Sequence, residues 1–113
     1  HAERAGRRAE MVALWWLRLK CFSILAHRYK SPVGEVDLIV KRGRQIIFVE
    51  VKARQRIDQF GETLESVNQS RIIAAANHFV SHHPSLMHMQ MRFDIILVAP
   101  WRLPTHMCDA FRP

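Results

Sequence analysis

The sequence predicts a small α/β protein with one domain that occupies residues 1–113. Residues 3–20 and 64–82 repeat their apolar side chains with the period of a helix, whereas residues 34–54 alternate apolar and polar side chains as strands do. The 113 residues, 49% hydrophobic and 24% charged, supply one modest core and leave no room for a second domain. These patterns alone predict no more specific architecture.

The first predicted helix, residues 3–20, carries an apolar stripe that suits packing against a core. The stripe consists of Ala9, Val12, Ala13, Trp16 and Leu17. Most arginines of this segment lie outside the stripe and are expected at the surface. Glu10 borders the stripe, which places its carboxylate either over the edge of the sheet or in an ion pair within the helix, for example with Arg7.

Residues 22–30 are predicted to form a first strand, antiparallel to a hairpin over residues 34–54 that turns at Gly43 and Arg44. The register that follows from this turn makes one face of the hairpin apolar throughout. It pairs Val36 with Val51, Leu38 with Val49, and Val40 with Ile47 on that face, and Glu35 with Lys52, Asp37 with Glu50, and Ile39 with Phe48 on the other. A shift by one residue would set the acids against valines, so the apolar pattern fixes the register.

Asp37 and Glu50 are therefore predicted to place two carboxylates on one face, with Cβ atoms about 5 Å apart. Like charges at this separation repel each other, so a positive group is expected between them. Lys52 lies two residues after Glu50 on the same face and is one candidate. A divalent cation is the other, because Mg²⁺ usually takes one or two carboxylates together with water and substrate phosphate.

These residues resemble the core of the PD-(D/E)xK nucleases, in which an acid precedes a strand with an acid-x-Lys triplet. The matching segments are GEVDLI at residues 34–39, FVEVKAR at residues 48–54 and RFD at residues 92–94. Their order and spacing resemble the YraN-like family, small bacterial proteins similar to the archaeal Holliday-junction resolvases. No proline precedes Asp37, where the nuclease signature has one. The resemblance covers nearly the whole chain and implies a restriction-endonuclease-like mixed sheet with flanking helices.

The resemblance also implies an activity, namely Mg²⁺- or Mn²⁺-dependent cleavage of DNA, with branched DNA as a candidate substrate. Asp37 and Glu50 would hold the metal, with the main-chain carbonyl of Val51 as a further ligand. The metal would polarise a phosphoryl oxygen and lower the pKa of its water. Lys52 would orient that water or stabilise the negative charge of the transition state.

Glu35 and Glu10 are expected as second-rank ligands or outer-shell partners of the same site. Glu10 begins the pattern Glu-x-x-Ala-x-x-aromatic-Leu, which the resembled proteins carry in their first helix. The glycine usual after that helix is replaced here by Lys20 and Cys21, so the end of the helix is open. In the second helix, Arg71 stands where the family usually has a lysine and keeps the positive charge.

Positive charge is concentrated in the half of the chain that carries the acids. Residues 1–56 hold 13 Lys and Arg against 5 Asp and Glu, or +8, whereas residues 57–113 have a balance of −1. This asymmetry indicates a polyanion partner, and DNA before a membrane, because no basic amphipathic segment is paired with an exposed apolar anchor. A surface that only keeps the protein dissolved explains the same counts. The residues expected to contact nucleic acid are Arg7, Arg8, Arg54, Arg56 and Arg71.

The second helix, residues 64–82, is preceded by a polar loop over residues 55–62 and is expected to be N-capped by Thr63 or Ser66. Its pair of histidines, His78 and His82, has the spacing of metal ligands on a helix. Zinc is disfavoured there because no third ligand lies nearby in the sequence.

Residues 92–99 are predicted to form a fourth, central strand, and residues 106–111 a short edge strand. Asp94 interrupts the apolar run, and a salt bridge to Arg92 or a strand-end cap accounts for it better than a catalytic role.

Cys21 and Cys108 form no CxxC motif, which is typical of a reduced, cytoplasmic protein. No apolar run reaches the about 20 residues that span a bilayer, and no signal-peptide pattern is present, so no membrane is expected. A homodimer is implied only by the similarity to the resolvases.

Two other classes of function remain open. One is a nucleic-acid-binding module that keeps the fold and the charges without catalysis. The other is a structural or assembly protein in which Asp37, Glu50 and Lys52 form a surface ion-pair network. A pure binder does not need the set of two acids and a lysine, whereas failure to bind any metal would favour the structural protein.

Overall fold

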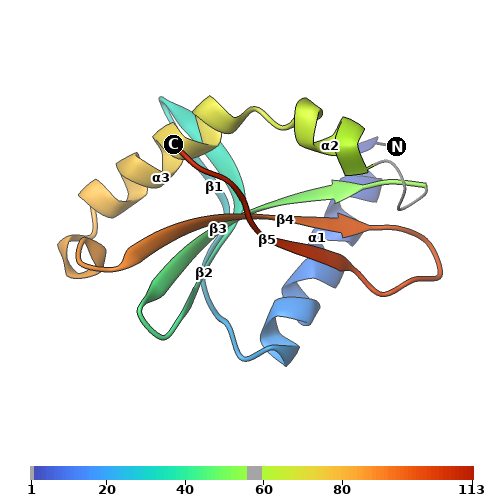
Figure 1. Ribbon diagram of the computed structural model, residues 1–113, viewed down its shortest axis with the longest axis horizontal. Coiled ribbons are helices and arrows are strands. Elements are labelled where there is room, and N and C mark those ends of the chain that lie inside the picture. The colour runs from blue at the N-terminus through green and yellow to red at the C-terminus, as the bar shows by residue number, and fades with distance from the viewer. Residues whose placement is uncertain (1, 56–59) are drawn as a thin grey trace.

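The computed structural model describes residues 2–55 and 60–113, with the side chains of residues 6–55 and 61–113. In chain order the elements are α1 (Ala2–Leu19), β1 (Ser23–Ser31), β2 (Gly34–Arg42), β3 (Gln45–Ala53), α2 (Phe60–Ser66), α3 (Gln69–Ser81), the 3-10 turn η2 (Pro84–Leu86), β4 (Gln90–Val98) and β5 (Thr105–Phe111) (Figure 1). No described helix is long and apolar enough to cross a membrane. Arg56, one of the expected DNA contacts, lies outside the described residues.

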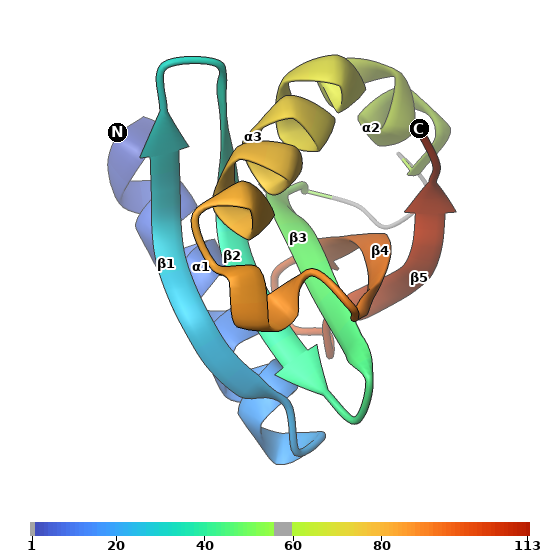
Figure 2. The same ribbon diagram turned by 90° about the vertical axis from the view of Figure 1, so that its left-hand side faces the viewer.

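The five strands form one sheet in the order β1-β2-β3-β4-β5. Neighbouring strands run antiparallel except β3 and β4, which run parallel and are joined by the segment that contains α2 and α3. Helix α3 packs on one face of the sheet and α1 on the other (Figure 2). The protein is thus a single α/β domain with a mixed sheet between helices, consistent with the predicted restriction-endonuclease-like fold.

The alternation of side chains along the central strands builds two cores, one on each face of the sheet. On the α1 face the core includes Ala13, Leu17, Leu38, Val40, Ile47 and Val49. On the α3 face it includes Ile39, Ile46, Phe48, Ala75, Ala76 and Phe79. Because helices cover both faces of the sheet, β3 is buried along most of its length. The side chains at the end of this strand are therefore held in a fixed position.

The predicted second helix proves to be two helices. The segment 64–82 was expected to be continuous, but α2 ends at Ser66 and α3 begins at Gln69. The side chain of Asn68 accepts a hydrogen bond from the Arg71 main-chain nitrogen at 3.3 Å and so caps α3. The N-caps predicted at Thr63 and Ser66 are therefore wrong for this helix, and the polar loop is shorter than expected because α2 starts at Phe60.

The position of the fourth strand also differs from the prediction. Residues 92–99 were expected to lie at the centre of the sheet, but the middle strand is β3. Strand β5 pairs with the outer side of β4, so β4 is second from the edge and is still buried over most of its length. The edge strand predicted over residues 106–111 is confirmed as β5.

Candidate acidic site

The site begins where β2 and β3 separate. The predicted hairpin register is confirmed for Leu38 with Val49, Ile39 with Phe48 and Val40 with Ile47. Among the described residues the pairing stops at Leu38 and Val49, because from there β2 continues with β1 while β3 continues with β4. The ladder pairs predicted beyond this point, including Asp37 with Glu50, are therefore wrong as main-chain partners.

Asp37 lies where β2 and β3 separate, and its side chain extends between the two strands. The main-chain nitrogen of Val51 donates a hydrogen bond to Oδ2 of Asp37 at 2.8 Å. A carboxylate thus accepts the hydrogen bond that a main-chain carbonyl would accept in a continuous ladder. Val36 changes sides at the same place and packs in the core on the α3 face, whereas it was predicted to share a face with Leu38 and Val40, which pack on the α1 face. The distortion therefore fixes both the position of Asp37 and its direction.

The side chains of Asp37 and Glu50 still come together, because both line the same cavity and each influences the pKa of the other. Burial raises the pKa of Glu50 to about 8, and the negative charge of Asp37 adds to the effect. Burial also raises the pKa of Asp37, against the hydrogen bond from Val51. Two half-buried carboxyl groups this close together are stabilised when they share a proton or a cation, because ionising both without a positive charge between them is unfavourable.

Lys52 supplies part of that positive charge. Its Nζ lies 3.7 Å from Oε2 of Glu50, beyond the usual length of a hydrogen bond, and 27% of its side chain remains exposed. The lysine lowers the pKa of both acids, but less than burial raises it for Glu50. Lys52 is thus close enough to influence the acid pair and free enough to reach a ligand at the surface.

Glu10 joins the site from α1. Its carboxylate accepts a hydrogen bond from Arg28 Nε at 2.9 Å and contacts His27 Nε2 at 3.1 Å, and only 13% of the side chain is exposed. Glu10 and Asp37 line the same cavity, and the negative charge of Glu10 adds to the rise in the pKa of Asp37 that burial mainly causes. Of the two placements open from the sequence, the edge of the sheet is the one observed.

Arg28 and His27 were not predicted as site residues. The register of β1 with β2 sets His27 beside Leu38 and Tyr29 beside Val36, so Arg28 lies across from Asp37. Arg28 has a positive φ of 57° within a strand, a conformation that costs on the order of 1–3 kcal/mol in a residue other than glycine. The sequence signal was the predicted antiparallel pairing of residues 22–30 with the hairpin, which brings this arginine to the acids.

Two cavities open over the acids and share Glu35 and Glu50. One, of about 290 Å³, is lined by Glu10, Arg28, Tyr29, Lys30, Glu35, Val36, Asp37 and Glu50. The other, of about 230 Å³, is lined by Glu35, Glu50, Lys52, Ser66, Asn68, Arg71 and Ile72. The acids thus lie between two groups of basic residues, one on β1 and one formed by Lys52 and Arg71.

The expected nucleic-acid contacts have different surroundings. Arg7 and Arg8 are exposed on α1, and Arg71 is exposed at the start of α3. Arg54 donates from Nε to the Thr63 hydroxyl at 2.9 Å and from Nη2 to the Ser66 hydroxyl at 3.1 Å. It therefore ties α2 to the end of β3, and its contact with nucleic acid stays a prediction.

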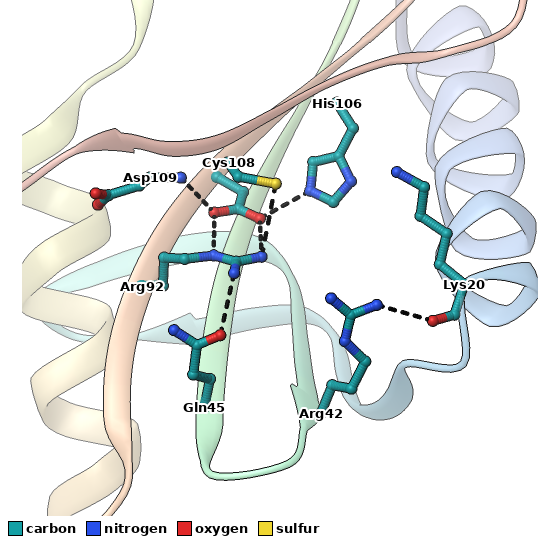
Figure 3. A network of polar contacts seen from close by, with 8 residues as sticks. Lys20, Arg42, Gln45, Arg92, His106, Cys108 and Asp109 are labelled. Atoms are coloured by element: carbon teal, nitrogen blue, oxygen red, sulfur yellow. Dashed lines mark hydrogen bonds and ion pairs between the residues drawn. The ribbon is translucent and has the colours of Figure 1, made fainter.

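Asp94 belongs to a separate network (Figure 3). Its fully buried carboxylate receives Arg92 Nε and Nη2, each at 2.9 Å, His106 Nε2 at 2.7 Å and the Asp109 nitrogen at 2.9 Å. The predicted salt bridge to Arg92 is confirmed. Asp94, His106 and Cys108 are the one trio of described residues that brings metal-binding atoms together, but the guanidinium already lies on the carboxylate and four donors occupy it. This network joins β5 to β4.

Taken together, the mixed sheet between two helices and the buried acid pair beside a lysine define a protein of the restriction-endonuclease-like class. The model of the uncharacterised protein family UPF0102 matches residues 9–98, and the chain belongs to this YraN-like family, as the sequence motifs predicted.

Relatives in this family align with nearly the whole chain. The UPF0102 protein of Parvibaculum lavamentivorans is 45% identical over 112 residues, which are 99% of this chain and 84% of that protein. The UPF0102 protein of Paramagnetospirillum magneticum is 48% identical over 115 residues, with 98% and 89% covered. That of Caulobacter vibrioides is 38% identical over 110 residues, with 97% and 88% covered. None of these names states an activity.

Proposed function

We propose that this protein is a Mg²⁺-dependent endonuclease that hydrolyses DNA phosphodiester bonds beside Asp37 and Glu50. The observation that carries the proposal is that the half-buried carboxyl groups of Asp37 and Glu50 line one cavity where β2 and β3 separate. Burying two acids together opposes folding, so a cation that neutralises them would stabilise the site. A chain that needed only a stable sheet would be better served by apolar residues at these positions.

The donor set fits a hard divalent cation. Asp37 and Glu50 offer carboxylate oxygens from adjacent strands, and the Val51 carbonyl is the further oxygen ligand that we propose. Bound there, Mg²⁺, or Mn²⁺ in its place, would polarise a phosphoryl oxygen and make a water molecule more acidic. Glu10 and Glu35 line the cavity around the pair and would act as outer-shell acceptors for water.

The basic residues around the acids would hold the DNA backbone. Lys52 is placed to donate a hydrogen bond to the attacking water or to a phosphate oxygen that gains charge in the transition state. Arg71 and Lys30 line the two cavities from opposite sides, and phosphate contacts of this kind position a nucleic acid without reading its sequence. Because the acids are recessed between these cations, the phosphate would be drawn towards the metal ligands.

A structural ion-pair network is the second candidate, and the 3.7 Å contact between Lys52 and Glu50 is the observation that favours it. In that case the lysine alone would neutralise the pair, and the protein would neither bind metal nor cleave DNA. The high pKa of Glu50 argues against this candidate, because Lys52 leaves the repulsion between the acids largely uncompensated.

Cleavage assays on a supercoiled plasmid and on a four-way junction with Mg²⁺ or Mn²⁺ test the proposal. Wild type and Glu65→Gln, which changes an exposed glutamate outside both cavities, should nick the DNA. Asp37→Asn, Glu50→Gln and Lys52→Ala should each reduce the rate at least about 100-fold, by analogy with the loss of one group that stabilises a transition state. Cleavage that survives in Glu50→Gln, or a wild type that cleaves neither substrate, would overturn the proposal.

A further inference from the structure

A third cavity lies on the α1 side of the sheet and shares no residue with the cavities over the acids. It is a groove between the first half of α1 and the connection from β4 to β5 (Figure 1). Its volume is about 560 Å³, within the usual range of about 300–1,000 Å³ for pockets that hold small molecules. Its lining consists of Arg8, Ala9, Val12, Ala53, Gln55, Val98, Ala99, Pro100, Trp101 and Arg102.

The lining of the groove combines apolar side chains with two cations. Alanine, valine and proline make up most of the lining, and the exposed arginines Arg8 and Arg102 come from α1 and from the connection after β4. No acid is found among its lining residues in the described part of the chain. The occupant that complements this surface has a flat or apolar body and a negative charge.

Trp101 makes the rim of the groove unusual. Its side chain is fully exposed, at 102% of the reference area, so it adds nothing to either core. Its φ is +62°, a left-handed conformation that is a genuine outlier for a bulky residue. The chain thus holds a large aromatic ring in solvent, beside Arg102, by means of a strained backbone. A ring presented in this way offers a whole face for stacking.

We propose that this groove binds one unpaired nucleotide, with the base stacked on Trp101 and the phosphate at Arg8 or Arg102. Aromatic rings interleaved with cations are the means by which proteins hold single-stranded nucleic acid, because every base has a face that stacks and every nucleotide has a phosphate. Gln55, at the edge of the groove, adds a polar group that can reach the edge of a base.

The place of the groove connects it with the proposed cleavage, on which this part of the inference rests. Ala53, in its lining, directly follows Lys52, and Val98 is the partner of Ala53 in the parallel ladder. The groove and Lys52 are therefore neighbours at the same end of β3, on opposite faces of the sheet. Holding a splayed nucleotide there would favour frayed or branched DNA over a continuous duplex.

The shape of the groove distinguishes a nucleotide from a lipid surface. Helix α1 also exposes Met11, Trp15 and Leu19, at 48%, 58% and 75%, and these protruding residues would suit a bilayer. The groove is instead a hollow lined by two arginines, which receives a single ring better than a flat surface does. Trp15, also exposed but outside the groove, supplies a matched control.

Binding without divalent metal, in the presence of a chelator, tests the inference separately from cleavage. The probes are a short oligothymidylate, a blunt duplex of equal length, thymidine monophosphate, and vesicles that contain phosphatidylglycerol. Trp101→Ala should weaken oligothymidylate binding about tenfold, the effect expected for the loss of one stacked base. Trp15→Ala should leave it within about twofold, and duplex binding should not change in either variant.

The outcomes separate the sources of the ligand. If thymidine monophosphate competes at concentrations close to those of the oligonucleotide, the groove is a site for free nucleotides. If it fails to compete, the groove holds a nucleotide within a strand. Both outcomes support the inference. Equal losses for duplex and single strand, no loss in Trp101→Ala, no binding of either nucleotide probe by wild type, or Trp101-dependent binding of the vesicles alone would overturn it. A wild type that binds through Trp101 but never cleaves would overturn the proposed function only.

Discussion

At the scale of single residues, the site is defined by where charge is buried. The half-buried acids Asp37 and Glu50 lie side by side in one cavity, whereas the fully buried Asp94 is neutralised by Arg92 and accepts four hydrogen bonds. The consequences for the pKa are opposite: burial raises that of Glu50, while the donors around Asp94 lower its pKa in spite of burial. The lowered pKa of Asp94 is typical of an acid that is already paired within the fold. The raised pKa of Glu50 indicates an acid pair that still lacks a neutralising cation.

The raised pKa of Glu50 predicts how stability depends on pH. Between its ordinary value of 4.5 and its folded value of about 8, the folded protein holds a proton that the unfolded chain has released. In the absence of metal the free energy of unfolding should therefore fall as the pH rises through this window. Glu50→Gln should remove most of this slope, and Glu65→Gln should keep it. Urea unfolding at several pH values measures the slope, and equal slopes in all three proteins would contradict the prediction.

Asp94 should behave in the opposite way. Because its folded pKa is lowered from 3.8, its contribution to stability is present above that pH and disappears as the pH falls through the folded value. Asp94→Asn should destabilise the protein at neutral pH by about 3–5 kcal/mol, since Arg92 would lose its buried partner. Chemical unfolding measures the loss. A change below about 1 kcal/mol, the worth of an exposed ion pair, would mean that the network is only a surface contact.

At the scale of elements, α3 is held against the start of β2 by a glycine. A Cβ at Gly34 would collide with the Arg71 carbonyl, so the first turn of α3 can approach Glu35 and the acid cavities only because residue 34 has no side chain. Gly34→Ala should destabilise the protein by about 1–3 kcal/mol, as overpacking does. Gly6→Ala, in α1 with open space around it, is the matched control and should not destabilise. Equal thermal midpoints for the two variants would contradict this account.

The helices and strands show what the sequence could predict and what it could not. The alternation of apolar side chains predicts that Leu38 pairs with Val49, and the structure confirms this pair. The prediction succeeds because both faces of the hairpin are buried there. The same alternation continues to Val51, so nothing in the pattern marks where β2 leaves β3. The break at Asn68 was missed for a similar reason, because the apolar period runs through the residue whose side chain caps the start of α3. Local sequence patterns thus predict helices and strands. Where two strands separate, or where one helix ends and the next begins, depends on tertiary contacts.

For the site, the motif predicted that Asp37 and Glu50 lie close together, and both line the same cavity, while their role as metal ligands stays a prediction. Helical periodicity could place Glu10 at the edge of a stripe, but its partners on β1 became visible only when α1 was packed across the sheet. Arg28 was missed because an arginine in a strand is normally expected to point into solvent. The predicted pairing of residues 22–30 with the hairpin pointed to this arginine only indirectly, and its ion pair with Glu10 became visible in the structure.

At the scale of the whole molecule, a strongly basic chain surrounds a small acidic centre. The net charge is +7, and exposed cations occupy α1, the start of α3 and the surroundings of the acids. If this surface binds DNA, the logarithm of affinity should fall linearly with the logarithm of salt concentration, with a slope of about −0.9 per phosphate neutralised. Reversing Arg7 and Arg8 to glutamate should reduce both affinity and slope without unfolding the protein, because both residues are exposed. Filter binding over a range of salt measures the effect, and an affinity that ignores salt would exclude a role in DNA binding.

The most direct measurement of the central claim is calorimetric titration of Mn²⁺ into the metal-free protein near neutral pH. If Asp37 and Glu50 form a metal site, wild type should bind about one ion and release up to about one proton, because the cation displaces the proton that the raised pKa of Glu50 retains. Repeating the titration in buffers with different ionisation enthalpies counts that proton. Glu50→Gln should bind more weakly and release less. A wild type with no heat of binding and no rise in thermal midpoint at millimolar Mn²⁺ would contradict the metal site and leave Lys52 as the permanent partner of the acids.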